Sequence, residues 1–160
     1  MAEKESVTLV AFSGELDKAL AAFNIAIGAA SMGMEVSMFF TFWGLNIIKR
    51  NEGSIKSRGI MRKMLNRMNR GGSKRLHLSK FHMLGMGTRM MKQMMKDMNF
   101  PQLEEMMAMA KGMGVKFIAC TTSMGMMGIG KEAFIPDVDS FAGVATYLAE
   151  AKEGNVNLFI

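Results

Sequence analysis

The sequence predicts an α/β protein built on a mostly parallel sheet. Residues 6–12 (SVTLVAF) form a short apolar, β-branched run that is typical of a buried strand. An alanine-rich segment with helical periodicity follows at 16–32, and a second strand-like run, EVSMFFTF, occupies 35–42. Strand, helix and strand with short connections indicate a right-handed βαβ unit and therefore parallel strands. The chain has 160 residues, so we expect one domain spanning 1–160.

The first helix has the clearest pattern. Leu16, Leu20 and Phe23 recur at helical spacing, which predicts one apolar face. Asp17 lies in the first turn, where the helix dipole favours an anion. Gly33 is a suitable C-cap, so we expect the helix to end just before it.

The rest of the chain divides into an irregular insertion and further regular elements. Residues 51–80 are rich in glycine and basic side chains, and Ile60, Met64 and Met68 lie four residues apart, which predicts a basic amphipathic helix near 58–70. This insertion separates the second and third strand units of a sheet of about five strands. The other predicted elements are a helix that could begin within 44–50, helices over 84–98, 102–113 and 140–152, a loop or short helix after residue 120, and strands over 115–120 and 155–160.

The charge of the chain is unevenly distributed. The net charge is +6, yet residues 49–75 contain ten Lys or Arg residues and one Glu, a local charge of +9. Such a segment could meet an acidic partner, nucleic acid or anionic lipid. A solvated helix and loop is the simpler interpretation, and the segment lacks the aromatic residues that single-strand binding uses. We therefore expect no nucleic-acid partner.

One stretch resembles a membrane span in composition. From residue 19 to residue 48 the only charged side chain is Glu35, and about 20 apolar residues suffice to cross a bilayer. Gly33 and Glu35 interrupt this run where it changes from a helical to a β-rich pattern, so two successive buried elements explain it better than a span. The N-terminal sequence also lacks the features of a secretory signal. Together with a single cysteine, which fits a reducing compartment, these features predict a cytoplasmic protein.

That single cysteine is the main candidate for chemistry. Cys120 falls at the carboxyl end of a predicted parallel strand, where open α/β sheets collect ligands. The following Thr121, Thr122 and Ser123 could cap a helix that starts near Met124. The backbone N–H groups and the positive end of that helix favour thiolate over thiol, and the three hydroxyl groups could donate to the sulfur. The competing interpretation is a structural thiol, because free cysteine is often a small buried residue.

Further residues are candidates for a pocket: Ser13, Gly14, Thr41, Trp43, His77, His82 and Met124. The turn at Ser13 and Gly14 lies between a strand and a helix and can bind an anion, although it lacks a nucleotide-binding glycine pattern. His77 and His82 are five residues apart, so they would not share one helical face as a metal pair. Either histidine could reach Cys120 as a proton carrier.

Methionine is unusually frequent, with 21 copies. These residues recur at helical steps before Cys120 and directly after it: Met83, Met86, Met90, Met94 and Met98, then Met124, Met126 and Met127. Thioethers beside a thiolate could bind Cu(I), whereas helical spacing among apolar neighbours favours adaptable core or packing between subunits. Cu(I) handling stays an alternative, as does a binding module for a nucleotide or anion; we expect no resident metal or cofactor.

Four segments carry a resemblance to a known family: FSGELDKALAAFNIAIGAASMGMEVSMFFTFWGLNIIK, LHLSKFHMLGMGTRMMKQMM, GVKFIACTTSMGMMGI and VATYLAEA. They are similar to the DsrE/DsrF-like sulfurtransferase family, in the branch sometimes identified as peroxiredoxin-like. The resemblance implies a flavodoxin-like three-layer α/β/α fold, homo-oligomers such as trimers or hexamers, and a role in sulfur relay. It also implies that Cys120, in CTTSMGMMG, occupies the place of the family's sulfur-binding cysteine.

The resemblance implies sulfur donor and acceptor proteins, or low-molecular-weight persulfides, as partners. It does not establish enzymatic turnover, because many relatives look like carriers. The chain has no second cysteine, so a peroxide cycle would need an external thiol to resolve a sulfenate. The resulting hypothesis is a sulfurtransferase or persulfide carrier: the Cys120 thiolate accepts a sulfane sulfur and passes it to an acceptor thiol.

Overall fold

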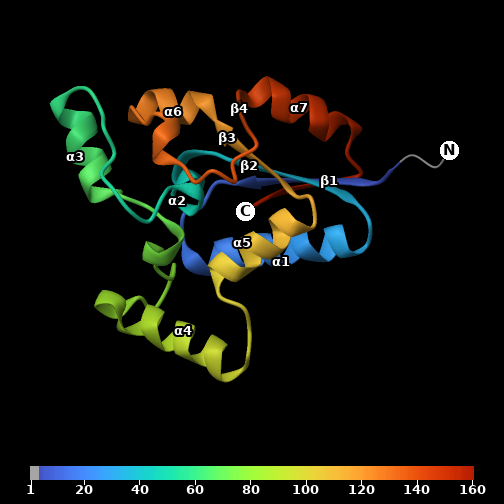
Figure 1. Ribbon diagram of the computed structural model, residues 1–160, viewed down its shortest axis with the longest axis horizontal. Helices are drawn as coiled ribbons and strands as arrows, with labels where there is room; N and C mark the ends of the chain where they lie inside the picture. Colours follow the sequence, from blue (N-terminus) through green and yellow to red (C-terminus); the bar gives the residue numbers. More distant parts are fainter. Residues whose placement is uncertain (1–3) are drawn as a thin grey trace.

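A five-stranded parallel sheet forms the middle layer of the computed structural model, which describes residues 4–160 (Figure 1). Its strands are β1 (Ser6–Ala11), β2 (Glu35–Phe40), β3 (Lys116–Cys120), β4 (Ser140–Ala142) and β5 (Val156–Phe159), in the spatial order β4-β3-β2-β1-β5. Strands β1 to β4 follow one another across the sheet, and β5 returns to the other side of β1. The predicted α/β class with a mostly parallel sheet of about five strands is confirmed.

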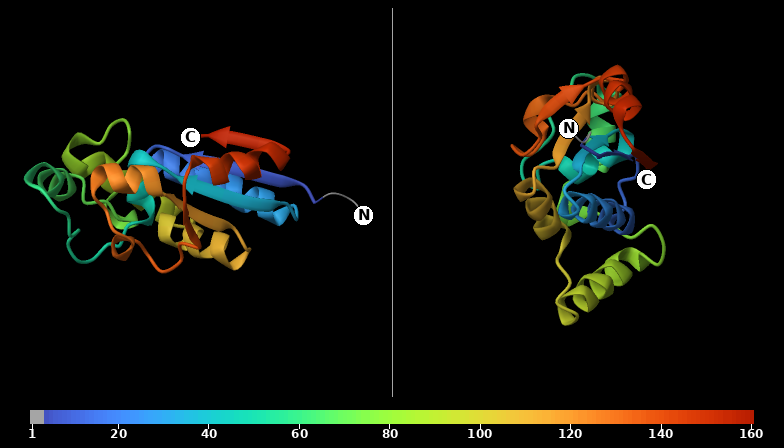
Figure 2. Two further views of the ribbon diagram at one scale, coloured as in Figure 1. Left: turned by 90° about the horizontal axis from the view of Figure 1, so that it is seen from above. Right: turned by 90° about the vertical axis from the view of Figure 1, so that its right-hand side faces the viewer.

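Helices cover both faces of this sheet. The helix α1 (Leu16–Ser31) and the helix α5 (Leu103–Gly112) lie on one face, and α6 (Thr121–Met127) and α7 (Val144–Glu153) lie on the other (Figures 1 and 2). This is the three-layer α/β/α arrangement that the resemblance implies. The remaining elements are α2 (Leu45–Ile48), α3 (Ile60–Met68), α4 (Met86–Asp97) and the 3-10 turns η1 (Phe42–Gly44), η2 (Ser73–Arg75), η3 (Met83–Gly85) and η4 (Lys131–Ala133).

The alternation of side chains along the strands divides the interior into two unequal parts. The larger cluster packs the sheet against α1 and α5, and its centre is aromatic: the ring of Phe23 lies 5.6 Å from that of Phe117, edge to face. The smaller cluster lies on the opposite face and contains Val10, Phe39 and Ile118 from three adjacent strands, with Cys120. The cysteine therefore belongs to the thinly covered face of the sheet.

The structure corrects three predicted boundaries. Residues 140–142, predicted as the start of a helix over 140–152, form strand β4 and pair in parallel with β3, while the helix begins at Val144. The open edge of β3 supplies hydrogen-bond partners that a local helical pattern cannot reveal. Strand β2 ends at Phe40 rather than residue 42, because the chain turns into η1. The short helix after Cys120 begins directly at Thr121 and not near Met124.

The segment between β2 and α5 contains the predicted basic helix near 58–70, which is α3. In the described part of the chain, no helix combines the length and apolar character needed to cross a bilayer.

Candidate functional site

Cys120 lies at the junction between a strand and a helix. It is the last residue of β3 and, with φ −71° and ψ 112°, the N-cap of α6. Cys120 is 4% exposed. Ala142 and Tyr147, the latter in α7, pack against the small apolar cluster that contains it. The ring of Tyr147 stacks on that of Phe39 with their centroids 5.3 Å apart. The thiol thus sits at the carboxyl end of the sheet, as predicted for ligand sites in open α/β sheets.

Two hydroxyl groups meet beside this thiol. The Thr41 Oγ1 and Ser123 Oγ atoms lie 2.9 Å apart, and the Phe42 backbone N–H donates to Ser123 Oγ at 3.1 Å. Ser123 lies in the first turn of α6 and is buried, while Thr41 directly follows β2. The ends of two adjacent parallel strands therefore bring these hydroxyl groups to the sulfur.

These groups set the acidity of the thiol. Burial alone would raise the pKa of Cys120, but hydrogen bonds from the backbone and hydroxyl of Ser123, the hydroxyl of Thr41 and the backbone of Thr122 together lower it below the ordinary value of 9.0. A lowered pKa increases the thiolate fraction, and the thiolate is the nucleophilic form of cysteine. The local geometry therefore supports a reactive sulfur.

The three predicted hydroxyl donors divide between the site and the surface. Ser123 is buried against the sulfur, whereas the Thr121 and Thr122 side chains are exposed and Thr122 contributes its backbone. The Phe42 amide was not among the predicted groups. The Phe42 amide could be found only from the register of β2 and β3. This register pairs Phe40 with Ala119 and so places residues 41 and 42 beside residue 120.

A glycine-dependent turn holds Thr41 in place. The Thr41 N–H donates to the Ala11 carbonyl at 3.1 Å, and the Gly44 N–H donates to the Phe12 carbonyl at 2.8 Å. A Cβ atom on Gly44 would overlap the Ala11 carbonyl oxygen, and one on Gly14 would lie 2.5 Å from the Trp43 carbonyl oxygen. The turn η1 can approach β1 this closely only because both positions lack a side chain.

Four of the other candidate residues line a second cavity. Gly14, Trp43, His77 and His82 border a space of about 560 Å³, which Cys120 does not line. The two imidazole rings meet edge to face, with centroids 4.4 Å apart. Burial lowers the pKa of His77, as do the nearby His82 and Lys92. The structure thus brings the two histidines to each other and to Trp43 rather than to the thiol.

The remaining candidates lie elsewhere. The Ser13 N–H donates to the Ile160 carbonyl at 3.3 Å. Met124 and Met127 are buried in the larger core cluster, and Met126 is exposed, whereas Cys120 belongs to the smaller cluster. Met124 and Met127 therefore pack in a different apolar cluster from Cys120. No group of three or more His, Cys, Asp or Glu side chains within residues 4–160 is placed to hold a metal ion.

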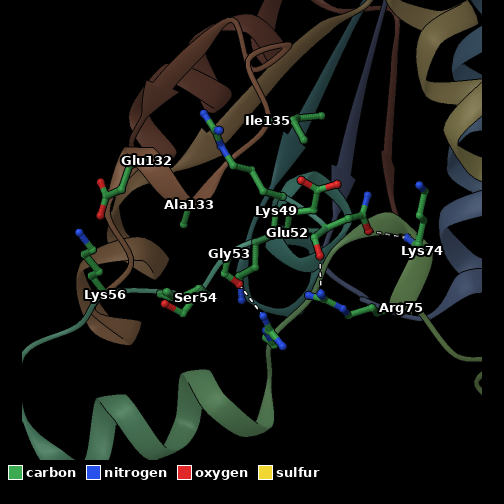
Figure 3. A pocket seen from close by; sticks show the side chains of 14 residues that line it. Lys49, Glu52, Gly53, Ser54, Lys56, Lys74, Arg75, Glu132, Ala133 and Ile135 are labelled. Atoms are coloured by element: carbon green, nitrogen blue, oxygen red, sulfur yellow. Dashed lines mark hydrogen bonds between the residues drawn. The ribbon is translucent and has the colours of Figure 1, made fainter.

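A third feature is a cavity of about 570 Å³ lined by basic side chains (Figure 3). Its cations are Lys49, Arg50, Lys56, Arg70, Lys74 and Arg75, and its carboxylates are Glu52 and Glu132. Several guanidinium groups are anchored on backbone carbonyls: Arg50 Nε donates to Phe134 at 2.9 Å, and Arg70 Nη2 donates to Gly53 at 2.6 Å. Within the described chain, none of the six cations forms an ion pair. The cavity wall therefore carries uncompensated positive charge.

Lys49 is the most unusual of these cations. It is 1% exposed, and its Nζ atom donates to Asn46 Oδ1 at 2.7 Å and to the Asn69 carbonyl at 3.1 Å. Burial lowers its pKa to about 8. A buried amine with only neutral acceptors is costly to charge.

Comparison with known proteins agrees with this architecture. The chain is 43% identical over 158 residues to the uncharacterized protein YrkE of Bacillus subtilis (strain 168), covering 99% of this chain and 98% of that protein. It is 33% identical over 165 residues to the sulfur carrier protein DsrE2 of Allochromatium vinosum, covering 99% of both chains.

Two solved structures share the fold. The ychN protein from E. coli has a TM-score of 0.60 at 10% identity over 98% of this chain and 99% of its own. MTH1491 of Methanobacterium thermoautotrophicum, a protein of unknown function, has a TM-score of 0.55 at 10% identity over 99% of this chain and 100% of its own. The model of the DsrE/DsrF/DrsH-like family matches residues 3–159. The chain therefore belongs to the DsrE/DsrF/DrsH-like family.

Proposed function

We propose that this protein is a sulfur carrier that holds sulfane sulfur as a persulfide on Cys120. Its family and its 33% identity to a protein named as a sulfur carrier support a role in sulfur relay. The observation that carries the assignment to Cys120 is the lowered pKa of this thiol despite its burial, which the hydrogen bonds of Ser123 and Thr41 explain. Cys120 is also the only cysteine of the chain.

The proposed transfer consists of two displacement steps. The Cys120 thiolate attacks the outer sulfur of a donor persulfide, so an S–S bond forms to Cys120, the donor S–S bond breaks, and the donor thiolate leaves. An acceptor thiolate then attacks the outer sulfur of the Cys120 persulfide and releases the Cys120 thiolate. The two steps are balanced without an external oxidant or reductant. The Ser123 and Thr41 hydroxyls and the Thr122 backbone stabilise the anionic sulfur as nucleophile and as leaving group.

Access to the sulfur depends on α7. Cys120 is almost fully buried, and Tyr147 of α7 lies over its cluster. No residue of α7 is fully buried, so this helix is held by few core contacts. We place the approach of donor and acceptor at this face, because segments with little buried apolar surface open at low cost.

Intact mass spectrometry tests the carrier directly. The protein is incubated with a low-molecular-weight persulfide, excess reagent is removed, and the mass is measured without reductant. A gain of about 32 Da, one sulfur atom, that maps to Cys120 and disappears with a reductant is the expected result. The variant Cys120→Ala is the control and should gain nothing. Absence of the adduct, together with a thiol that resists alkylation in the folded protein, would show that Cys120 is structural.

Binding of a small anion is a second candidate function, favoured by the basic cavity. Six cations and two carboxylates line it. The side chains of Lys56 and Lys74 form no hydrogen bond within the described chain, so changing them should leave the cavity loops in place. Calorimetry with inorganic pyrophosphate and with ATP is the test. Binding that weakens about tenfold in Lys56→Gln/Lys74→Gln, but not in the surface control Lys152→Gln, would support this function. No heat with either anion would remove it.

The proposed carrier also assembles with copies of itself, as the resemblance implies, and acts in the cytoplasm, where reducing conditions keep a thiol free. Exposed apolar side chains on the edge strand β5, namely Val156 and Phe159, support association at that edge of the sheet. Sedimentation velocity of the full chain and of Phe159→Glu tests it. A monomer in the unmodified protein would contradict the proposal.

A further inference from the structure

Helix α3 turns its apolar side away from the domain. Ile60, Met61, Met64 and Met68 lie on one side of the helix, and all four are exposed. The only fully buried residue of α3 is the polar Asn66, whose Nδ2 donates to the Met127 carbonyl at 3.0 Å. An amphipathic helix of a globular domain normally packs by its apolar face. Here the polar Asn66 and the partly buried Leu65 attach the helix to the domain, while the four exposed apolar side chains remain in solvent.

Helix α4 also presents a row of apolar side chains to solvent. Met86, Met90 and Met94 follow one another at four-residue steps and are exposed, whereas the helix is anchored on the domain by Thr88 and Met95. Both helices stand outside the three layers, α3 beyond α6 and α4 beyond α1 and α5 (Figure 1).

The turn that precedes α4 adds to this surface. Phe81, Met83 and Leu84 have φ values of 58°, 47° and 58°, in the left-handed region that non-glycine residues rarely adopt. These conformations are less favourable for residues that carry a Cβ atom than an ordinary helical or extended conformation. The side chains of Phe81 and Leu84 are nonetheless directed to solvent, at 81% and 103% exposure. A conformation that is costly and yet presents large apolar groups to water indicates a contact outside the chain.

The charge around these apolar side chains has one sign. Residues 53–98 contain twelve Lys or Arg residues and a single acid, Asp97, a net charge of +11, whereas the rest of the chain carries −5. No cation of this segment forms an ion pair within residues 4–160. Apolar and basic side chains gather on different sides of each helix, as for Met64 against Arg62 in α3.

We infer that α3, α4 and the turn at 81–85 form a peripheral binding surface for an anionic lipid bilayer. A strong separation of apolar and basic faces at low mean hydropathy is the pattern of helices that lie in the membrane interface. Methionine, leucine and phenylalanine would enter the boundary of headgroups and acyl chains, and the Lys and Arg side chains would remain among the anionic headgroups. The inference is independent of the chemistry at Cys120.

Other occupants fit the surface less well. A symmetric contact with a second copy would place two segments of charge +11 against each other without acids to pair them. Nucleic acid would use the positive charge but not the exposed methionines and leucine. A folded acidic protein would need pockets for side chains that protrude as far as Leu84, whereas a bilayer accepts protruding groups without a preformed cavity.

Vesicle sedimentation with the full chain tests the inference. We expect binding to vesicles of equal parts phosphatidylglycerol and phosphatidylcholine, and at least tenfold weaker binding to pure phosphatidylcholine. Leu84→Ser and Met64→Ser should each weaken binding at least threefold, because each removes an inserted side chain. Met126→Ser, which removes an exposed methionine of α6, is the matched control and should bind normally.

Three outcomes would overturn the inference. The first is no binding to the anionic vesicles. The second is binding that salt abolishes and that Leu84→Ser and Met64→Ser leave unchanged, which would show a purely electrostatic contact of the kind that nucleic acid also makes. The third is self-association that Met64→Ser or Leu84→Ser abolishes in sedimentation equilibrium, which would assign the surface to a second copy.

Discussion

The hydroxyl oxygens of Thr41 and Ser123 lie 2.9 Å apart although 82 positions separate the two residues in the sequence. One follows the end of β2 and the other lies in the first turn after β3, and these strands are neighbours in the sheet. Both hydroxyls lower the pKa of Cys120. The reactivity of the thiol is therefore a joint property of two strand ends.

Ser123→Ala should raise the pKa of Cys120, because it removes one of the hydrogen bonds that stabilise the thiolate. The measurement is the rate of alkylation by iodoacetamide as a function of pH, whose midpoint should move upward. Thr121→Ala, which removes an exposed hydroxyl, should leave the midpoint unchanged. Equal profiles for all three proteins would show that Ser123 does not control the thiolate.

Tyr147→Ala should increase the alkylation rate of Cys120 several-fold at a pH where the thiol is ionised. The tyrosine ring covers the cluster of the cysteine and stacks on Phe39, so its removal opens the path to the sulfur. Leu148→Ala changes an exposed neighbour in the same helix and is the control. A rate unchanged by Tyr147→Ala would mean that reagents reach the thiol by another route.

Gly44→Ala should destabilise the protein by roughly 2 kcal/mol or more, because the new methyl group overlaps the Ala11 carbonyl and displaces the turn that holds Thr41. Urea denaturation measures the change. Gly28→Ala is the control, since this helical glycine of α1 has open space around it, and alanine there should stabilise by about 0.5–1 kcal/mol. Similar stability of the two variants would contradict the close approach of η1 to β1.

Lys49 should make the free energy of unfolding rise with pH in a defined window. Its pKa is about 8 in the folded protein and 10.5 ordinarily, so between these values the unfolded state binds more protons. Stability increases with pH wherever that holds, because the cost of a buried charge disappears as the folded amine loses its proton.

Urea denaturation of Lys49→Met across this window should show a smaller rise than the unmodified protein. The lowered pKa of Cys120 adds a rise of the same sign in both proteins, so their difference isolates Lys49. Lys152→Met is the control for loss of a surface charge. If the free energy of unfolding of Lys49→Met rises with pH as steeply as that of the unmodified protein, the pKa of Lys49 is not lowered in the folded state.

Local signals determined much of this protein from the sequence alone. Periodicity and apolar runs are properties of adjacent residues, so β1, α1, α5 and β3 were predictable, as was the place of Cys120 at a strand end. The basic helix α3 followed from the spacing of Ile60, Met64 and Met68 in the same way.

Tertiary structure decided what depends on residues distant in sequence. Strand β4 exists because the edge of β3 offers it hydrogen bonds, which override the local pattern of a helix. The order of the strands places Thr41 beside Ser123. The fold of the segment after β2 places His77 and His82 at a separate cavity, which Trp43 also lines. The sequence predicted an apolar side for α3, but only its attachment through Asn66 showed that this side faces outward. A periodic pattern specifies that a helix has two faces, and the packing of the whole chain decides which face is buried.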